Sequence, residues 1–218
     1  MNLNNVTTID MDRVTCWVID LDETLYTHEA GVWDMIRKRI DRFLRDEMRF
    51  PEAEVDRLRA RLFKQYGTTL RGLQVEYQVD MAAYLRYVHD IPLEAVLKPN
   101  PALSEMLASL PQRKVIFTNA DEDHAVRVLT LLGVRDHFDL IVDIYDSAPH
   151  CKPELAAFQK ALALIGEAPE ACLLVDDSPP NLATARSLGM QTVSVGQRHH
   201  DGSPHIVRIE ALGELINT

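Results

Sequence analysis

Five short apolar runs place the strongest limit on how this chain can fold. Each is rich in Val, Ile or Leu with little polar alternation, which is typical of strands buried on both faces of a parallel sheet. Helical stretches separate the last four runs, and this alternation predicts right-handed crossovers between parallel strands. We therefore predict an α/β fold. The predicted strands are Val14–Asp20, Lys114–Asn119, Leu140–Ile144, Cys172–Asp176 and Thr192–Val195.

Turn and cap residues mark the ends of the predicted helices. The helices Asp123–Leu132 and Pro153–Ile165 are each followed by a glycine, which suits the left-handed position after a helix. A helix over Ser178–Leu188 is predicted to begin with a serine cap and Pro179 at its first position. These helices follow strands at the spacing that parallel crossovers require.

The connection between the first two strands is roughly 90 residues long, which is too long for a structureless loop in a compact domain. Its apolar residues recur with helical spacing instead. We predict two helices separated by Pro51 and a third from Val75 to Val88. Residues 27–98 are therefore predicted to form a small all-helical cap, and residues 1–26 and 99–218 to form the core.

Polar residues gather where the predicted strands end. Asp20 and Asp22 follow the first strand, and other polar residues follow the second and fourth strands. In an open α/β sheet, ligands bind at this edge. Two carboxylates at i and i+2 point the same way from an extended backbone and repel each other, so a divalent cation is the expected remedy. The other candidates are Thr118, Asn119, Lys152, Asp176 and Asp177.

This set of side chains predicts phosphoryl transfer on a small phosphorylated metabolite. Oxygen ligands from Asp20, Asp176 and Asp177, together with a backbone carbonyl, suit Mg²⁺. One carboxylate can act as a nucleophile, and another can protonate the leaving oxygen and later activate water. The hydroxyl, amide and ammonium groups needed to hold phosphate oxygens are supplied by Thr118, Asn119 and Lys152.

The sequence resembles the haloacid dehalogenase (HAD) superfamily of phosphatases. The resemblance rests on DLDETLY, FTN, CKP and VDDS and covers Val14 to about Val195. It implies a Rossmann-like core with a C1-type helical cap, a Mg²⁺ cofactor and an aspartyl-phosphate intermediate. It further implies that Asp20 is the nucleophile and also a metal ligand. Asp22 would be the general acid and base, with its main-chain carbonyl on the metal. Thr118 and Lys152 would bind phosphate, and Asp176 and Asp177 would complete the metal site, with Asp177 favoured as the direct ligand.

A narrower resemblance points to the pyrimidine 5′-nucleotidase branch. It rests on the stretches YGTTLRGL, YLRYVHDIPLEAVLKPNPAL, FTNADEDHAVRVLTLLG and CKPELAAFQKAL. It implies a nucleoside 5′-monophosphate such as UMP or CMP as substrate. Arg71, in a predicted cap loop, is a candidate for contact with a base carbonyl or phosphate. The alternatives are a phosphatase of phosphoglycolate or a sugar phosphate, a phosphomutase, a 2-haloacid dehalogenase and a non-catalytic regulator.

Composition excludes several other classes of function. A net charge of −10 disfavours binding to nucleic acid or to anionic membrane surfaces. Cys16, Cys151 and Cys172 have no metal-ligand spacing and predict a reducing, cytoplasmic environment. The polar amino terminus predicts no secretory signal, and no apolar run approaches the roughly 20 residues that span a bilayer. The oligomeric state is left open.

Overall fold

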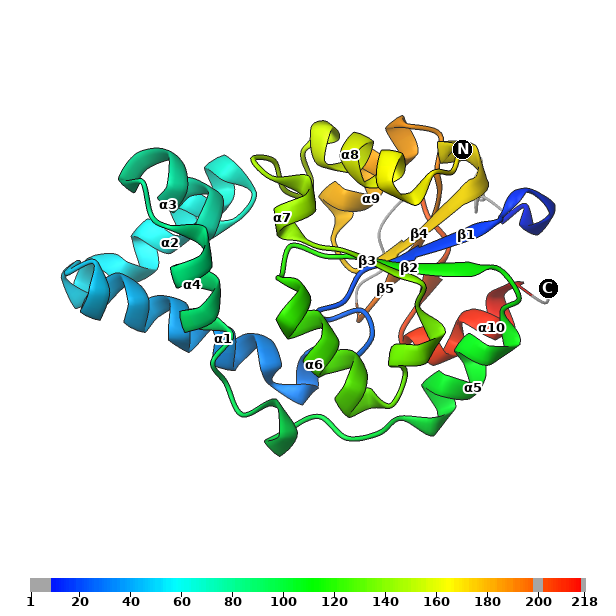
Figure 1. Cartoon of the computed structure of the whole chain (residues 1–218), viewed down its shortest axis with the longest axis horizontal. Coiled ribbons are helices and arrows are strands. Elements are labelled where there is room, and N and C mark those ends of the chain that lie inside the picture. Colours follow the sequence, from blue (N-terminus) through cyan, green and yellow to red (C-terminus); the bar gives the residue numbers. More distant parts are fainter. Residues whose placement is uncertain (1–8, 198–201, 217–218) are drawn as a thin grey trace, which may run out of the picture.

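The computed structural model describes residues 9–197 and 202–216. Its centre is a six-stranded sheet in the order β3-β2-β1-β4-β5-β6, with every neighbouring pair parallel (Figure 1). The predicted parallel α/β fold is therefore confirmed. Residues 1–8, on which the prediction of no secretory signal rests, lie outside the described residues. The strands are β1 (Cys16–Ile19), β2 (Arg113–Phe117), β3 (Leu140–Val142), β4 (Cys172–Asp176), β5 (Gln191–Val195) and β6 (His205–Ile206).

The two faces of the sheet pack against different helices, which explains why the strands are apolar throughout. Trp17 and Ile19 of β1 belong to one buried cluster, whereas Cys16 and Val18 belong to another. Successive residues of a strand point to opposite faces, so both faces must be covered. In Figure 1, α5 (Pro101–Ser109), α6 (Glu122–Leu132) and α10 (Leu212–Ile216) lie below the sheet, and α8 (Leu155–Ile165) and α9 (Pro179–Ser187) lie above it.

Helix ends follow the expected cap chemistry with one exception. Gly133 and Gly166 have φ angles of 74° and 78° after α6 and α8, a conformation that glycine adopts without strain. Ser178 and Pro179 occupy the cap and first positions of α9 as predicted, but the Ser178 side chain makes no cap hydrogen bond. Instead, the Ser178 backbone N–H donates to Asp176 Oδ1 at 2.8 Å. The carboxylate that ends β4 therefore organises the turn into α9.

Two further differences concern short elements. The predicted strand Leu140–Ile144 ends early at Val142, because Ile144 begins the short helix α7 (Ile144–Ser147). The Asp143 carboxylate starts this helix by accepting hydrogen bonds from Tyr145 N and Asp146 N at 2.8 and 3.1 Å. β6 was not predicted, since a two-residue strand leaves no readable periodicity.

Residues 27–98 contain a group of helices at one end of the molecule, to the left of the core in Figure 1. The predicted single helix Val75–Val88 was wrong. The chain breaks at Gln78, whose φ angle is 56°, and the Asp80 side chain then caps the next helix by accepting from Ala83 N at 2.8 Å. The helices are α1 (Val32–Arg42) with a π-helical extension (Phe43–Glu47), α2 (Glu52–Tyr66), α3 (Thr69–Tyr77) and α4 (Met81–Val88). We call this group the cap helices; its action as a lid stays a prediction.

Short 3₁₀ turns connect the larger elements. They are Met11–Arg13, His28–Ala30, Leu93–Ala95, Arg135–His137, Pro169–Ala171 and Ile209–Ala211.

In the part of the chain that the structure describes, each helix is too short or too polar to cross a lipid bilayer.

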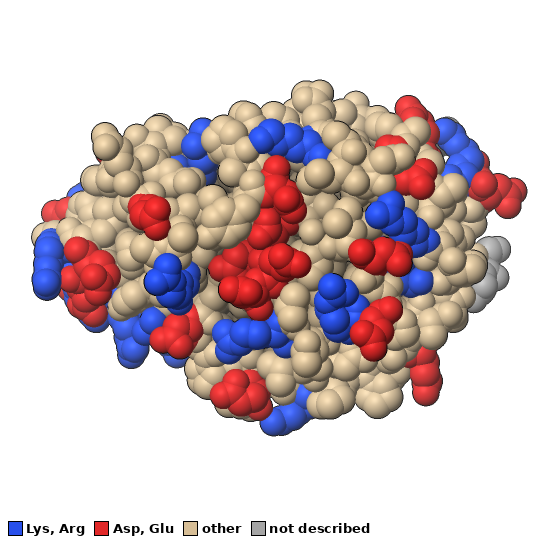
Figure 2. Space-filling view, viewed as in Figure 1, with Lys and Arg blue, Asp and Glu red and all other residues tan. Residues whose placement is uncertain are grey.

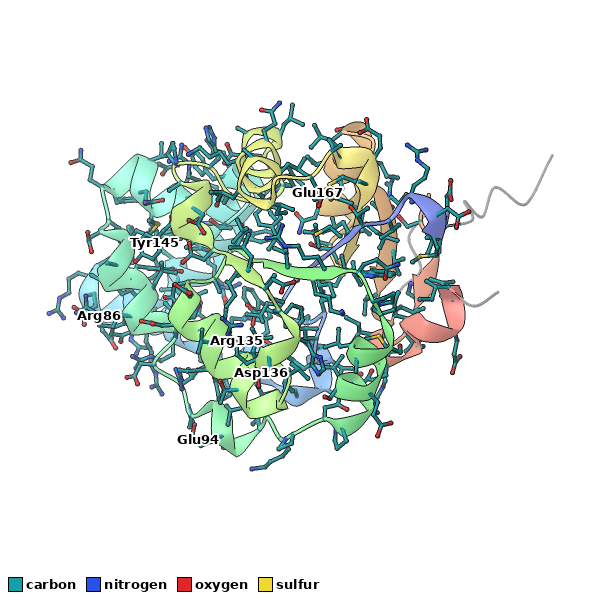
Figure 3. All side chains as sticks on the ribbon, turned by 45° about the vertical axis from the view of Figure 1, so that its right-hand side comes forward. Arg86, Glu94, Arg135, Asp136, Tyr145 and Glu167 are labelled. Atoms are coloured by element: carbon teal, nitrogen blue, oxygen red, sulfur yellow. The ribbon has the colours of Figure 1, made fainter. Side chains whose placement is uncertain are left out.

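Two of the places where residues 27–98 meet the core lie near the ends of the cap helices. The Arg127 guanidinium on α6 donates to the backbone oxygens of His89 and Ile91 at 2.9 and 2.8 Å, which fixes the segment that returns from the cap. The loop before α3 lies on the core, because a Cβ added to Gly67 would meet Pro153 Cδ at 3.1 Å. Figure 3 shows Tyr145 of α7 toward the cap helices.

Charge on the surface is mixed rather than basic. In the view of Figure 2, Lys and Arg side chains are interspersed with Asp and Glu, and acidic side chains gather near the middle, over α6 and α7. These elements carry Glu122, Asp123 and Asp146. That the protein does not bind nucleic acid stays a prediction from its net charge.

Gly72→Ala is expected to destabilise the cap helices. A Cβ at Gly72 would meet Leu62 Cδ2 at 2.7 Å and Leu62 Cβ at 2.8 Å, where α2 and α3 pack. Overpacking of this kind costs about 1–3 kcal/mol in the free energy of unfolding, measured by urea titration. Gly213→Ala in α10 is the matched control, because nothing lies within 4 Å of its added Cβ. Equal stability of the two variants would contradict the packing argument.

Candidate active site

Asp20 lies immediately beyond β1, at the edge where β1 and β4 both end. Its backbone N–H donates to the Val175 carbonyl at 3.0 Å, so the chain continues alongside β4 for one more residue. Its carboxylate is buried. Oδ1 accepts from Lys152 Nζ at 2.6 Å, and Oδ2 accepts from Thr24 Oγ1 at 3.1 Å. Both oxygens of the predicted nucleophile are therefore held in place.

Lys152 connects three strand ends. Its ammonium donates to Asp20, to the Phe117 carbonyl at the end of β2 at 2.7 Å, and to Asp176 Oδ2 at 3.1 Å. The side chain is 2% exposed. Burial alone would lower the pKa of Lys152, but the charges of Asp176 and Asp20 outweigh it and hold this pKa above its ordinary value. Lys152 therefore stays charged in the protein interior.

Three carboxylates converge beside this lysine. Asp20, Asp176 and Asp177 each offer an oxygen, and these oxygens lie within 4.8 Å of one another. Three negative charges facing the one ammonium of Lys152 leave an excess of two negative charges at this place. A hard divalent cation matches both the charge and the oxygen donors, so the residues fit the predicted Mg²⁺.

The two neighbouring aspartates at the end of β4 differ in burial and in the number of hydrogen bonds that their carboxylates accept. Asp176 is fully buried and accepts from Ser178 N, Lys152 and the Asn181 amide, the last at 3.0 Å to each oxygen. Asp177 has no side-chain hydrogen bond among the described residues, and it lines an open groove of about 820 Å³. This difference favours Asp177 as a direct metal ligand, as predicted.

Burial and the neighbouring negative charges raise the pKa of two of the three clustered carboxyl groups. Burial and the charge of Asp176 raise the pKa of Asp20 to about 7 against the lowering effect of Lys152. Burial and the charges of Asp20 and Asp176 raise the pKa of Asp177 to about 8. Both shifts express the excess negative charge, and a bound cation would oppose them.

Thr118 and Asn119 follow β2, as predicted. Thr118 is buried, and its hydroxyl oxygen accepts from Ala120 N at 3.0 Å, which leaves the O–H as a donor. The Asn119 side chain makes two hydrogen bonds to the backbone of Lys152: Nδ2 donates to its carbonyl at 3.0 Å, and Oδ1 accepts from its N–H at 2.9 Å. These bonds favour Asn119 as a residue that positions Lys152, and its contact with phosphate stays a prediction.

Asp22 points to a different set of partners. Its Oδ1 accepts from His124 Nε2 at 3.0 Å and also from the Tyr26 hydroxyl. Burial would raise the pKa of Asp22, but the charge and hydrogen bond of His124, with the Tyr26 hydrogen bond, lower it to about 2. The Asp22 carboxylate is not part of the three-carboxylate cluster among the residues described. This arrangement is compatible with a metal contact through the main-chain carbonyl alone.

Arg71 lies in the first turn of α3, which Thr68 begins by accepting from Arg71 N at 3.0 Å. Its guanidinium has no hydrogen-bond or ion-pair partner within residues 9–197 and 202–216. Burial raises the pKa of Cys151, next to Lys152, and the positive charge of Arg71 opposes this rise. The cap therefore brings the positive charge of Arg71 toward the segment that carries Lys152.

Four residues of this region were not predicted as functional from the sequence. Asn181 lies in the first turn of α9, His124 in the first turn of α6, and Tyr26 at the end of the first motif. His89 was interpreted as structural or exposed. A signal existed for the two helical residues, because side chains in the first turn after a strand end face the site edge.

A family model of haloacid dehalogenase-like hydrolases matches residues 14–189, so the chain belongs to this family. Phosphate metabolism protein 8 of Saccharomyces cerevisiae is 31% identical over 186 residues, which are 78% of this chain and 58% of that protein. A phosphoglycolate phosphatase of Chromobacterium violaceum is 35% identical over 98 residues, 45% of this chain and 44% of that protein. The chain thus spans only about half the length of these relatives.

Solved structures agree on the fold. The magnesium-bound YfnB protein of Bacillus subtilis has a TM-score of 0.62 at 17% identity, covering 94% of this chain and all of that chain. The predicted family is confirmed at the level of HAD-like hydrolases. The pyrimidine 5′-nucleotidase branch stays a prediction.

Metal-free protein is expected to lose stability as pH rises. An acid whose pKa is raised on folding binds its proton more tightly in the folded state. That advantage of the folded state is lost as pH rises from about 4, the pKa of an unfolded aspartate, through about 7 and 8 for Asp20 and Asp177. Thermal midpoints in EDTA should therefore fall between pH 5 and 9, and less so for Asp177→Asn.

Mg²⁺ should stabilise the protein more at pH 8.5 than at pH 6, because it competes with protons for the same oxygens. Thermal midpoints with and without the ion measure this difference. A gain that is independent of pH, or that survives unchanged in Asp177→Asn, would contradict the metal assignment.

Proposed function

We propose that the protein is a Mg²⁺-dependent phosphomonoesterase that works through an aspartyl-phosphate intermediate on Asp20. The supporting observation is the buried ion pair between Asp20 and Lys152 beside Asp176 and Asp177. A carboxylate nucleophile, a cation for the phosphate and an acidic cluster for a metal thus share one sheet edge. Relatives with phosphatase names support the same reaction class.

In the first half-reaction, a carboxylate oxygen of Asp20 attacks phosphorus in line with the leaving oxygen. The bond from Asp20 to phosphorus forms and the bond to the leaving oxygen breaks. Asp22, which must carry a proton when the substrate is bound, gives that proton to the leaving oxygen. The Lys152 ammonium and the Thr118 hydroxyl meet the charge on the phosphate oxygens. The products are an alcohol and phosphorylated Asp20.

In the second half-reaction, Asp22 takes a proton from water, and the water oxygen attacks phosphorus. The bond from phosphorus to Asp20 breaks, which frees inorganic phosphate and restores the carboxylate. When bound, Mg²⁺ supplies positive charge that offsets the excess of acids and orients the phosphate. Asp20, Asp176 and Asp177, with the Asp22 main-chain carbonyl, are the residues that would hold it.

The rival reactions are less well supported by this geometry. Displacement of halide requires neither a proton donor at the position of Asp22 nor a metal, so the acidic cluster favours phosphate chemistry. A phosphomutase would return the phosphoryl group to a product instead of releasing it. A non-catalytic regulator would have no use for a nucleophile, its cation and its metal site held together.

For the substrate, we propose a nucleoside 5′-monophosphate, with UMP and CMP first. Arg71 supports this choice of substrate. Its guanidinium, unpaired among the described residues, lies near Cys151 and could contact a base carbonyl or a ribose-linked oxygen. Phosphoglycolate is the second candidate, supported by the name of the Chromobacterium violaceum relative. The Thr68 hydroxyl lies 3.8 Å from Cys151 Sγ, next to Lys152, and we propose that the cap helices move away from this place to admit either substrate.

Asp20→Asn is expected to abolish phosphate release, with at least a thousandfold loss of kcat, because the amide is a poor nucleophile. Phosphate release from UMP in the presence of Mg²⁺ measures it. Asp136→Asn, the same change at an exposed position (Figure 3), is the matched control and should be fully active. An active Asp20→Asn enzyme, or wild-type activity that survives EDTA, would contradict the mechanism.

Arg71→Ala is expected to raise KM for UMP and CMP about tenfold, equivalent to about 1.4 kcal/mol, with a smaller effect on phosphoglycolate. The comparison of kcat/KM over UMP, CMP, purine monophosphates, phosphoglycolate and sugar phosphates measures this. Arg57→Ala, an exposed arginine of α2, should leave all values unchanged. A wild-type preference for phosphoglycolate over every nucleotide would show the substrate assignment to be wrong.

A further inference from the structure

His124 is a buried imidazole whose role the reaction described above does not explain. It lies in the first turn of α6, and its side chain is fully buried. Nε2 lies 3.0 Å from Asp22 Oδ1 across 102 positions of sequence. Nδ1 is buried without a hydrogen-bond partner among the described residues. Buried polar atoms are normally paired, so an unpaired one calls for a reason.

The hydrogen-bond partners decide which nitrogen carries the proton. A carboxylate oxygen accepts, so Nε2 must be the donor toward Asp22. Nδ1 has no hydrogen-bond partner among the described residues, so it contributes no polar contact of its own. His124 therefore has a single polar function in this structure, which is to donate one hydrogen bond to Asp22.

The Asp22 carboxylate is held by one of its two oxygens. The Tyr26 hydroxyl and His124 Nε2 both donate to Oδ1. Oδ2 accepts no hydrogen bond from any residue in the described ranges, and the Asp22 side chain is 21% exposed. Two donors on the same oxygen fix the orientation of the carboxylate and leave the other oxygen available.

A second histidine holds the His124 ring. The His89 ring stacks on it, with ring centroids 4.2 Å apart and an interplanar angle of 25°. His89 Nδ1 lies 3.1 Å from Asp121 Oδ2, and Asp121 also caps α6 by accepting from His124 N at 2.8 Å. The orientation of the imidazole is thus determined from two sides, as a positioning role requires.

We propose that His124 positions Asp22 for proton transfer, by donating from Nε2 to Oδ1 so that Oδ2 exchanges the proton with the leaving oxygen and with water. This role rests on the proposed function, in which Asp22 is the general acid and base. His124 acts through Asp22 and does not contact the substrate. Its loss should therefore impair proton transfer more than nucleophilic attack.

The leaving group separates these two effects. An alkyl phosphate needs a proton on its leaving oxygen, whereas 4-nitrophenyl phosphate expels a stable phenolate and needs little help. The ratio kcat/KM reports the first half-reaction alone, up to release of the alcohol or phenolate. A disturbance of folding or of phosphate binding would lower kcat/KM for both esters alike.

The experiment compares His124→Phe with wild type on an alkyl phosphate ester and on 4-nitrophenyl phosphate. The phenylalanine ring keeps the stacking on His89 but cannot donate. We expect kcat/KM to fall about tenfold to a hundredfold for the alkyl ester, a part of the 10²–10⁴ that general acid catalysis supplies, and less than about threefold for 4-nitrophenyl phosphate. His124→Gln, which retains a donor at the end of its side chain, should restore most of the alkyl activity.

Two reference variants complete the comparison. Asp22→Asn should show the same dependence on leaving group with larger losses. His137→Phe, which removes a histidine that lies 2.8 Å from Ser104 Oγ, is the matched control and should change neither ester. Should His124→Phe not fold, His124→Leu and His124→Gln carry the same comparison.

Equal losses for both esters, or no loss for the alkyl ester, would overturn the positioning role while leaving the phosphatase assignment intact. Failure of the proposed function has a different signature. In that case wild type releases no phosphate from any ester, or Asp20→Asn remains active, and the role of His124 falls with it.

Discussion

The buried pairing of Lys152 with Asp20 and Asp176 is the interaction on which the site depends. The ammonium joins the ends of β1, β2 and β4 through Asp20, the Phe117 carbonyl and Asp176. Burying these charges is costly unless each is paired and hydrogen-bonded. The lysine neutralises only part of the acid cluster, so the protein interior retains a demand for further positive charge. This excess of negative charge at the sheet edge is the basis for proposing a cation site there.

The four aspartates of the site differ in their hydrogen-bond partners, and these partners suit them to different proposed roles. Lys152 and Thr24 fix the orientation of the Asp20 carboxylate, as its proposed nucleophilic role requires. Both oxygens of Asp176 accept hydrogen bonds, from Lys152, the Ser178 N–H and the Asn181 amide. The Asp177 carboxylate accepts no side-chain hydrogen bond from the residues that the structure describes, and the Asp22 carboxylate accepts from His124 and Tyr26 instead. These differences follow from position at the sheet edge, since the side chains are identical.

The cap helices meet the core beside the same lysine. The Thr68 hydroxyl lies 3.8 Å from Cys151 Sγ, and Arg127 holds the returning segment at His89, whose ring stacks on His124. Phosphate-binding and proton-transfer groups therefore both lie next to cap residues. A substrate that displaces the cap would disturb both, which links leaving-group selection to the chemistry.

Local patterns in the sequence determined the parallel α/β fold and the motif residues at the strand ends, because burial on both faces and turn chemistry act over a few neighbouring residues. They did not reveal the break at Gln78, where an isolated residue with positive φ interrupts a helical pattern. Only the tertiary structure decided that Asn119 bonds to the backbone of Lys152 and that His124 donates to Asp22. Those contacts join segments 33 and 102 positions apart, and their distances depend on strand order and helix packing, which no local pattern encodes.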